Sequence, residues 1–280
     1  ILPFRSSRCR HKLCIKRMHR KKGLYTRVYC ERLSVQENTL QLKIKFCMII
    51  VWGSKTSRAA KEKTMDTVFF DMDGTLIDTE KYYNVCWCEA IAKFGYTITK
   101  EEALDLRSLG RPHVYRFFEE KYGKGFPYDE MRAYRKKIME EMLKRDGITV
   151  KPGAKEILLW LKSRQIRCMI ATATDLERTN RYLEMTGLSS YFDEIISAVM
   201  VKNGKPSPDI YQLACEKAGR IPSDCIAIED SPNGVRAAAA AGCRVFMIPD
   251  LDEPDEATRA LCEGVFPSLS ELRTHFVKIL

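Results

Sequence analysis

The sequence predicts an α/β fold, with a Rossmann-like parallel sheet, helices on both of its faces, and an inserted all-helical segment. After Met65, short apolar runs alternate with amphipathic stretches, which is the pattern of repeated strand and helix units. The runs are apolar at nearly every position, as expected of strands that are buried on both faces. Between about residues 80 and 148 the alternation stops and only helical patterns occur, so a separate segment interrupts the sheet-forming units.

The positions of the elements follow from the apolar runs and from the glycines that end the helices. Strands are predicted at residues 67–71, 167–173, 194–197, 225–230 and 244–248. Helices between them are predicted at residues 154–164, 176–186, 208–218 and 232–241. The inserted segment holds four helical patterns, each of which ends at or near a glycine.

The predicted elements divide the chain into three segments. Residues 65–79 and 149–280 form the predicted α/β core, and residues 80–148 form the predicted helical domain. Residues 1–64 differ in composition, because they hold 17 Lys and Arg against 3 Asp and Glu, a net charge of +14, whereas the rest carries −4. The overall charge of +10 therefore belongs to this leader and does not characterise the main body.

The basic leader has no clear periodicity, and we predict that it is disordered or a non-native, upstream-translated extension. The alternatives are a transit peptide or an arm that binds nucleic acid or anionic membrane, since the stretch is rich in basic residues and poor in acids. Cys9, His11, Cys14 and His19 lie close together in it, but their spacing matches no standard zinc motif.

The composition predicts a soluble protein of the cytoplasm. The apolar run at residues 46–52 is far shorter than the roughly 18–20 residues that cross a membrane. The 11 cysteines lack the dense, regular spacing of a disulfide-stabilised secreted scaffold. We therefore expect reduced thiols and no membrane partner, and we expect nucleic-acid binding only if the leader is native.

The stretch "VFFDMDGT" places two acids directly after the first apolar run. Side chains at positions i and i+2 of a strand point to the same side, so Asp71 and Asp73 can face one site. Ligands of open α/β sheets bind at this carboxyl edge. Gly74 lets the backbone turn sharply and Thr75 adds a hydroxyl. An acidic turn without a function would have the same sequence pattern, so this motif alone does not distinguish a functional site from an ordinary turn.

Further strand ends also carry polar side chains. Thr172 and Thr174 follow the second strand, where hydroxyl and N–H groups bind phosphate oxygens or begin a helix. Lys205 precedes a helix, a place where an isolated lysine is usually solvated. Glu229 and Asp230 end a buried strand, where two charges are costly. Together these positions are far more specific than any one of them.

The order Asp-x-Asp, Thr, Lys, Glu-Asp, with each member at a strand end, resembles the haloacid dehalogenase superfamily over about residues 65–280. The helical insert after "DMDGT" is similar to the cap of its helical-cap subgroup. The resemblance implies that Asp71 forms an aspartyl-phosphate and that Asp73 is the general acid and base. Thr172 and Lys205 then stabilise the transferring phosphoryl group. The implied substrate-binding residues are Thr75, Ala173 and Ser231 in the core and Arg111 in the insert.

The acidic residues also predict a metal ion. Carboxylates that converge beside one lysine raise one another's pKa values unless a cation lies among them. All-oxygen ligands beside a phosphate favour Mg²⁺. By similarity to the family, Asp71 and Asp230 supply carboxylate ligands. Asp73 then supplies its main-chain carbonyl, and Glu229 assists.

The sequence therefore predicts a Mg²⁺-dependent phosphatase of a small phosphorylated metabolite, a sugar or polyol phosphate. The first alternative is a mutase similar to β-phosphoglucomutase, which holds a second phosphate. Tyr83 stands where that mutase has a histidine, and Asp175 and Leu176 stand where it has lysine and asparagine. An acid in a distal phosphate pocket repels its ligand, which favours the phosphatase. A dehalogenase is disfavoured because Asp73 is present, and nucleic-acid or membrane binding through the leader is the second alternative.

Overall fold

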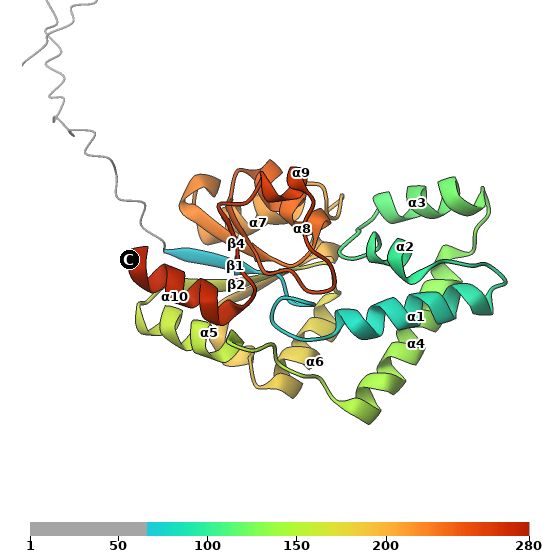
Figure 1. Ribbon diagram of the computed structural model, residues 1–280, viewed down its shortest axis with the longest axis horizontal. Helices are drawn as coiled ribbons and strands as arrows, with labels where there is room; N and C mark the ends of the chain where they lie inside the picture. Colours follow the sequence, from blue (N-terminus) through green and yellow to red (C-terminus); the bar gives the residue numbers. More distant parts are fainter. Residues whose placement is uncertain (1–65, 280) are drawn as a thin grey trace, which may run out of the picture. The chain divides into compact units, whose positions relative to one another are not determined.

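The computed structural model describes residues 66–279, which form a six-stranded parallel sheet with helices around it (Figure 1). The strand order is β3-β2-β1-β4-β5-β6, so the first strand of the chain lies inside the sheet. This arrangement confirms the predicted α/β class and the parallel sheet. The strands are β1 (Thr67–Phe70), β2 (Arg167–Thr172), β3 (Glu194–Ser197), β4 (Cys225–Glu229), β5 (Arg244–Met247) and β6 (Gly264–Val265).

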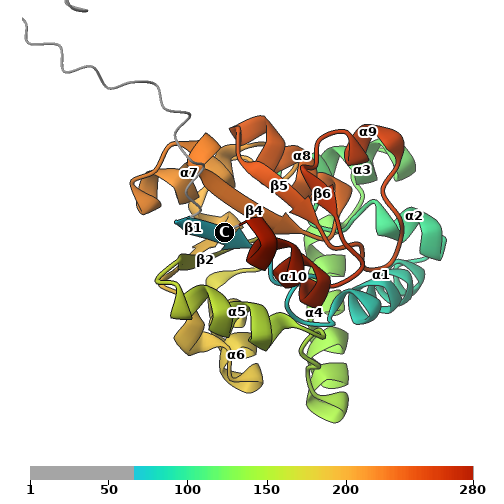
Figure 2. The ribbon, with the colours of Figure 1, turned by 60° about the vertical axis from the view of Figure 1, so that its left-hand side comes forward.

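Both faces of the sheet are apolar and both are covered by helices, as the continuous apolar runs predict. Phe70, Ile170 and Ile228 belong to the core on one face, under α5, α6 and α10. Phe69 and Met169 belong to the core on the opposite face, under α7 and α8 (Figure 2). The helices are α5 (Ala154–Ser163), α6 (Leu176–Thr186), α7 (Asp209–Ala218), α8 (Pro232–Ala241), α9 (Glu256–Arg259) and α10 (Leu269–Ile279).

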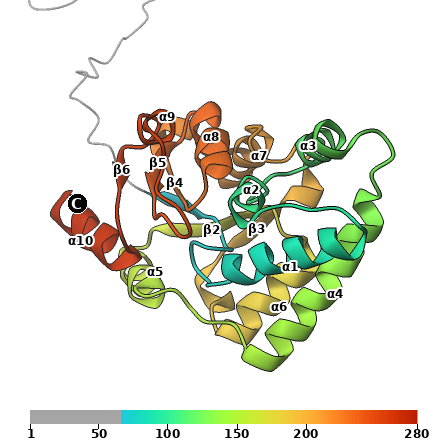
Figure 3. The same ribbon diagram turned by 45° about the vertical axis from the view of Figure 1, so that its right-hand side comes forward.

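Four helices separate β1 from α5, and residues 80–148 are called the helical insert from here on. Figure 3 shows that α1 and α4 of the insert lie side by side. The insert has an apolar core of its own, in which the rings of Trp87 and Tyr128 pack against Phe118. Its division from the sheet as a separate domain stays a prediction. The helices are α1 (Glu80–Lys93), α2 (Lys100–Leu104), α3 (His113–Tyr122) and α4 (Tyr128–Asp146).

The structure differs from the prediction mainly at element ends. β1, β2, β4 and β5 each end one residue before the predicted position. β6 was not predicted, since two residues are too few to show a period, and neither were α9 and α10. No helix within residues 66–279 has the length and hydropathy that a membrane crossing requires. The leader, with its proposed disorder and its Cys and His cluster, lies outside the described residues.

Candidate active site

The carboxyl ends of three neighbouring strands bring the predicted site residues together. Phe70 at the end of β1 pairs in register with Ile170 of β2 and Ile228 of β4. The next residues along these strands are therefore neighbours, and a hydrogen bond from the Asp71 amide to the Ile228 carbonyl (2.9 Å) extends the ladder to the first acid. This geometry is the reason why acids distant in sequence meet at one edge of the sheet.

Lys205 joins two of these acids by hydrogen bonds. Its Nζ atom donates to Asp71 Oδ1 at 2.5 Å, to Glu229 Oε1 at 2.6 Å and to the Ala171 carbonyl at 3.0 Å. The side chain is 1% exposed, so it is no solvated surface lysine. The Tyr211 hydroxyl donates a further hydrogen bond to Glu229 Oε1. The lysine and the tyrosine together fix one oxygen of Glu229, and the lysine alone fixes one oxygen of Asp71.

Burial dominates the electrostatics of this group. Removal from water, together with repulsion by Glu229 and Asp73, raises the pKa of Asp71 to about 8 despite the attraction of Lys205. Burial, with repulsion by Asp71, also raises the pKa of Asp230 well above its ordinary value. Burial alone would lower the pKa of Lys205, but the two carboxylates that it contacts raise it instead. The cluster therefore needs more positive charge than Lys205 supplies.

The arrangement of free oxygens fits a divalent cation. One carboxylate oxygen each from Asp71, Glu229 and Asp230 can lie within 4.8 Å of the others. Asp71 Oδ2, Glu229 Oε2 and both oxygens of Asp230 are buried and accept no hydrogen bond from any described residue. Buried acceptors without partners are costly, and an oxygen-binding cation would satisfy all of them. The Asp73 carboxylate is not part of this cluster.

Two glycines leave room for the acids. A Cβ atom on Gly74 would lie 2.4 Å from Asp230 Oδ2, and Gly74 has a φ of +81°, which favours glycine. A Cβ atom on Gly234 at the start of α8 would lie 1.9 Å from Glu229 Oε2. The carboxylates therefore pack against bare backbone.

Asp73 is held by two hydroxyl groups. Thr79 Oγ1 donates to Asp73 Oδ1 at 2.6 Å, and Thr174 Oγ1 donates to Asp73 Oδ2 at 2.7 Å. Thr174 was predicted as a phosphate-binding residue, but in the structure its hydroxyl orients the second acid. Thr79 was not predicted, because a threonine before a helix usually signals an N-cap.

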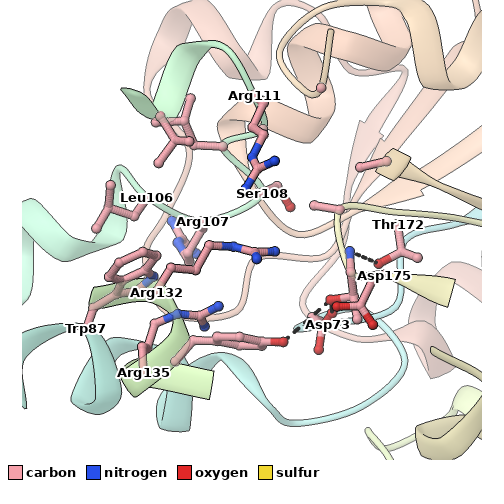
Figure 4. A pocket seen from close by; sticks show the side chains of 18 of the residues that line it. Asp73, Trp87, Leu106, Arg107, Ser108, Arg111, Arg132, Arg135, Thr172 and Asp175 are labelled. Atoms are coloured by element: carbon pink, nitrogen blue, oxygen red, sulfur yellow. Dashed lines mark hydrogen bonds between the residues drawn. The ribbon is translucent and has the colours of Figure 1, made fainter. Parts of the chain in front are cut away.

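A cavity of about 430 Å³ opens between the strand ends and the helical insert (Figure 4). Asp71, Asp73, Thr172 and Ala173 line it from the core, and Arg111 lines it from the insert. Lys205, Glu229 and Asp230 lie behind this surface and are almost fully buried.

Of the other predicted substrate-binding residues, one is exposed at the cavity and two are buried away from it. The Arg111 side chain is 57% exposed and forms an ion pair with Asp129 at 3.0 Å. Thr75 and Ser231 are buried and do not line the cavity. The Ser231 hydroxyl accepts a hydrogen bond from the Gly234 amide at 3.2 Å, so it is the N-cap of α8. Their roles in substrate binding stay predictions.

The expectation that Asp175 repels a distal phosphate is wrong in its premise. Lys136 Nζ lies 3.0 Å and Arg178 Nε lies 2.9 Å from Asp175 Oδ2. Burial would raise the pKa of Asp175, but the charge of Arg178 and the hydrogen bond from Lys136 outweigh it and lower the pKa. An acid that is neutralised by two cations does not repel an anionic ligand, because the local charge is positive.

Two charged residues of the site were missed. Glu80 lines the cavity and is 5% exposed, and burial, with repulsion by Asp73, raises its pKa to about 8. Arg107 forms a salt bridge with Asp252, and its Nη1 atom lies 3.9 Å from Asp230 Oδ2. Glu80 looks like an ordinary first-turn acid of a helix, and nothing in the sequence marks Arg107, so neither carried a signal.

The insert contacts the core through backbone near Lys205. The Gly110 amide donates to the Lys205 carbonyl at 2.8 Å, and the Gly204 amide donates to the Arg111 carbonyl at 2.6 Å. A Cβ atom on Gly110 would lie 2.5 Å from the Cα atom of Gly204. The loop that carries Arg111 is therefore docked on the loop that carries Lys205.

Comparison with known proteins places this geometry among phosphatases. Residues 65–242 match the family of haloacid dehalogenase-like hydrolases. The phosphorylated carbohydrates phosphatase of Thermotoga maritima is 32% identical over 188 residues, which cover 64% of this chain and 82% of that protein. The Drosophila melanogaster protein named "Probable pseudouridine-5'-phosphatase" is 33% identical over 210 residues, 73% of this chain and 90% of that protein. A crystal structure of CbbY from Rhodobacter sphaeroides in complex with phosphate has a TM-score of 0.63 at 28% identity and covers 75% of this chain and 96% of that one.

Proposed function

We propose, because the chain belongs to the haloacid dehalogenase-like hydrolase family, that this phosphoric monoester hydrolase is a Mg²⁺-dependent phosphatase of small phosphorylated sugars or polyols. The relatives described above include one named a phosphorylated carbohydrates phosphatase and one named a probable pseudouridine-5'-phosphatase, which supports a small phosphorylated metabolite as the substrate.

One observation carries the proposal: the two oxygens of Asp71 differ in their surroundings. Oδ1 accepts a hydrogen bond from Lys205, whereas Oδ2 is buried and has no partner among the described residues. Asp71 also lines the cavity. A carboxylate that a lysine fixes through one oxygen is held in a set orientation, which supports attack on phosphorus through one oxygen and metal binding through the other.

The reaction that we propose has two steps. The Asp71 carboxylate attacks phosphorus, the bond from phosphorus to the leaving oxygen breaks, and Asp73 gives its proton to that oxygen. Asp73 then takes a proton from water, which attacks the aspartyl-phosphate and releases inorganic phosphate. Thr79 and Thr174 hold the Asp73 carboxylate in place for both proton transfers. Lys205 balances charge next to Asp71 throughout.

Mg²⁺ would be held by Asp71, Asp230 and Glu229, with the Asp73 main-chain carbonyl as a further ligand proposed by similarity. When bound, the ion would supply the positive charge that lets an anionic phosphate approach these carboxylates. Thr172 and Ala173, which line the cavity, are proposed to bind the phosphate itself. The helical insert would act as a cap that excludes water and selects the substrate, with Arg111 as a contact.

The test is release of inorganic phosphate from p-nitrophenyl phosphate and from a panel of sugar and polyol phosphates, with Mg²⁺ or with EDTA. We expect turnover that requires Mg²⁺ and is lost in Asp71→Asn by at least about 10⁴-fold. The matched control is Asp78→Asn, in the same loop, whose carboxylate pairs with Lys81 at the surface. If Asp71→Asn keeps its turnover and its circular dichroism spectrum is unchanged, Asp71 is not the nucleophile.

A mutase remains the second candidate, and one observation favours it. Asp175 is neutralised by Lys136 and Arg178, so the insert side of the cavity does not exclude a second phosphate. The same panel separates the two functions when the isomerised sugar phosphate is measured beside free phosphate. Isomer formation without net phosphate release would contradict the phosphatase function and support the mutase function.

A further inference from the structure

Arg135 is a buried cation that forms no salt bridge with any acid of residues 66–279. It lies on α4 of the helical insert and is 4% exposed. The Nε and Nη1 atoms are buried and donate no hydrogen bond to any described residue. Its guanidinium group lies 4.8 Å from the ring centroid of Tyr83 and 4.6 Å from that of Trp87. The two rings contact the guanidinium group through cation–π interactions, which leave its Nε and Nη1 groups without a hydrogen-bond acceptor in the described part of the chain.

The charges nearest to Arg135 are also positive. Burial, together with repulsion by Arg178 and Arg132, lowers the pKa of Arg135 below its ordinary value. Within residues 66–279, neither Arg132 nor Arg135 forms a salt bridge. Arg178 pairs with Asp175, but that single acid is shared with Lys136. This part of the molecule therefore holds an excess of positive charge that the described residues do not neutralise.

These cations face the cavity of the candidate active site. Figure 4 shows the guanidinium groups of Arg132 and Arg135 on the insert side, pointing toward the side where Asp73 and Thr172 lie. The residues that line the cavity include seven basic and four acidic ones, and three of the acids, Asp71, Asp73 and Glu80, belong to the predicted phosphate end or adjoin it. The insert wall is thus the positive wall of the cavity.

We propose that Arg135 binds a second anionic group of the substrate, a carboxylate or a second phosphate, at the end remote from Asp71. The inference rests on the proposed function and narrows its substrate class to phosphate monoesters that carry another negative charge. A planar guanidinium whose buried N–H groups have no hydrogen-bond partner among the described residues matches the two oxygens of such a group. A neutral hydroxyl would leave the buried charge unpaired, which is costly in a water-poor cavity.

The experiment compares two substrates that differ in one group, 6-phosphogluconate with its carboxylate and sorbitol 6-phosphate with a hydroxymethyl group in its place. Binding to the Asp71→Asn variant is measured by calorimetry with Mg²⁺, and turnover of the wild type is measured in parallel. We expect the carboxylate compound to bind more tightly by about 10- to 100-fold, the worth of a charge-assisted hydrogen bond. Turnover should show the same preference in kcat/KM.

Variants assign the preference to Arg135. In the Asp71→Asn background, Arg135→Gln should reduce the preference to about one. Arg135→Lys keeps the charge and should retain part of the preference, which covers the case in which the glutamine variant folds poorly. Lys137→Gln is the matched control, because it removes one charge from an exposed position of the same helix and should change neither affinity.

The failure of this inference is distinguishable from the failure of the proposed function. Equal or weaker binding of 6-phosphogluconate, or a preference that persists in Arg135→Gln, would show that Arg135 only packs against its two rings. The absence of phosphate release by the wild type would instead contradict the phosphatase, and the binding comparison would still decide the role of Arg135.

Discussion

The two ends of the cavity are built in opposite ways. At the core end, acids are in excess and hydrogen bonds hold most of them: Lys205 contacts two carboxylates, and two threonine hydroxyls hold the carboxylate of Asp73. At the insert end, Arg135 is buried beside other cations and its Nε and Nη1 atoms have no partner among residues 66–279. Under the functions proposed above, the core end carries out the reaction and the insert end binds the second anionic group of the substrate. Chemistry and selectivity would then depend on different parts of the chain.

The largest effect is expected at the core end, from Lys205→Met. Removing this cation leaves Asp71 and Glu229 buried without their counter-charge, which costs about 3–5 kcal/mol of unfolding free energy. Phosphate release should fall below detection. Urea unfolding and a phosphate assay measure the two effects, with Lys217→Met as the control because that lysine is exposed and pairs weakly with Glu194. A stable and active variant would mean that the charges at the core end do not depend on one another.

Mg²⁺ and pH should act on the same end together. The folded pKa of Asp71 is about 8, above the ordinary value near 4, so without metal the folded protein holds more protons than the unfolded chain between these pH values. The unfolding free energy of the metal-free protein should therefore fall as pH rises through this window. Since Mg²⁺ replaces the protons, it should raise Tm by about 5 °C at pH 8 and by less than half of that at pH 5.5. Equal shifts at both pH values would argue against a metal among these carboxylates.

Tyr211→Phe should have an intermediate effect. It removes the hydroxyl that donates to Glu229 Oε1 and leaves Lys205 as the partner of that oxygen. A buried hydrogen bond to a charged group contributes about 1.5–3 kcal/mol to the unfolding free energy, so the variant should be less stable by about this amount. The value of kcat should fall by about tenfold, because Glu229 positions Lys205. KM should change little, since Tyr211 does not line the cavity. Tyr191→Phe, at a partly buried site elsewhere on the fold, provides the control.

The smallest effect is expected at the insert end, from Asp175→Asn. Asparagine is as good an N-cap as aspartate, so α6 should keep its first turn and the unfolding free energy should change by less than about 1 kcal/mol. Lys136 and Arg178 would lose their shared counter-ion. Affinity for 6-phosphogluconate should rise by about 3- to 10-fold. A fall in affinity would show that Asp175 positions these cations rather than neutralising them.

The core end could be predicted from the sequence because its signals are local. Each acid follows an apolar run, and parallel strands bring such positions to one edge, so the order of residues is enough to predict that Asp71 and Asp230 lie near each other. The fold class followed from the same runs. β6 was missed because two residues of an edge strand carry no periodicity.

The insert end could not be predicted because its signals depend on packing. α4 contains several basic residues, and the sequence does not show that Arg135 is the one that lies between two aromatic rings. The predicted repulsion by Asp175 ignored Lys136. These two residues are 39 positions apart in the sequence, and only the structure shows that they are in contact. Residues that select a ligand from a helix face are recognised only when their neighbours in space are known.

The backbone contact between Gly110 and Gly204 has a consequence for turnover. Each loop leaves room for no more than a hydrogen atom on the other, so a methyl group at either position would act as a wedge. Arg111 and Lys205 adjoin these glycines, and an added methyl group would therefore move apart the loops that carry them. If the proposed mechanism holds, such a variant would keep its reacting groups but admit bulk water, and the covalent intermediate would be exposed to any nucleophile that diffuses in.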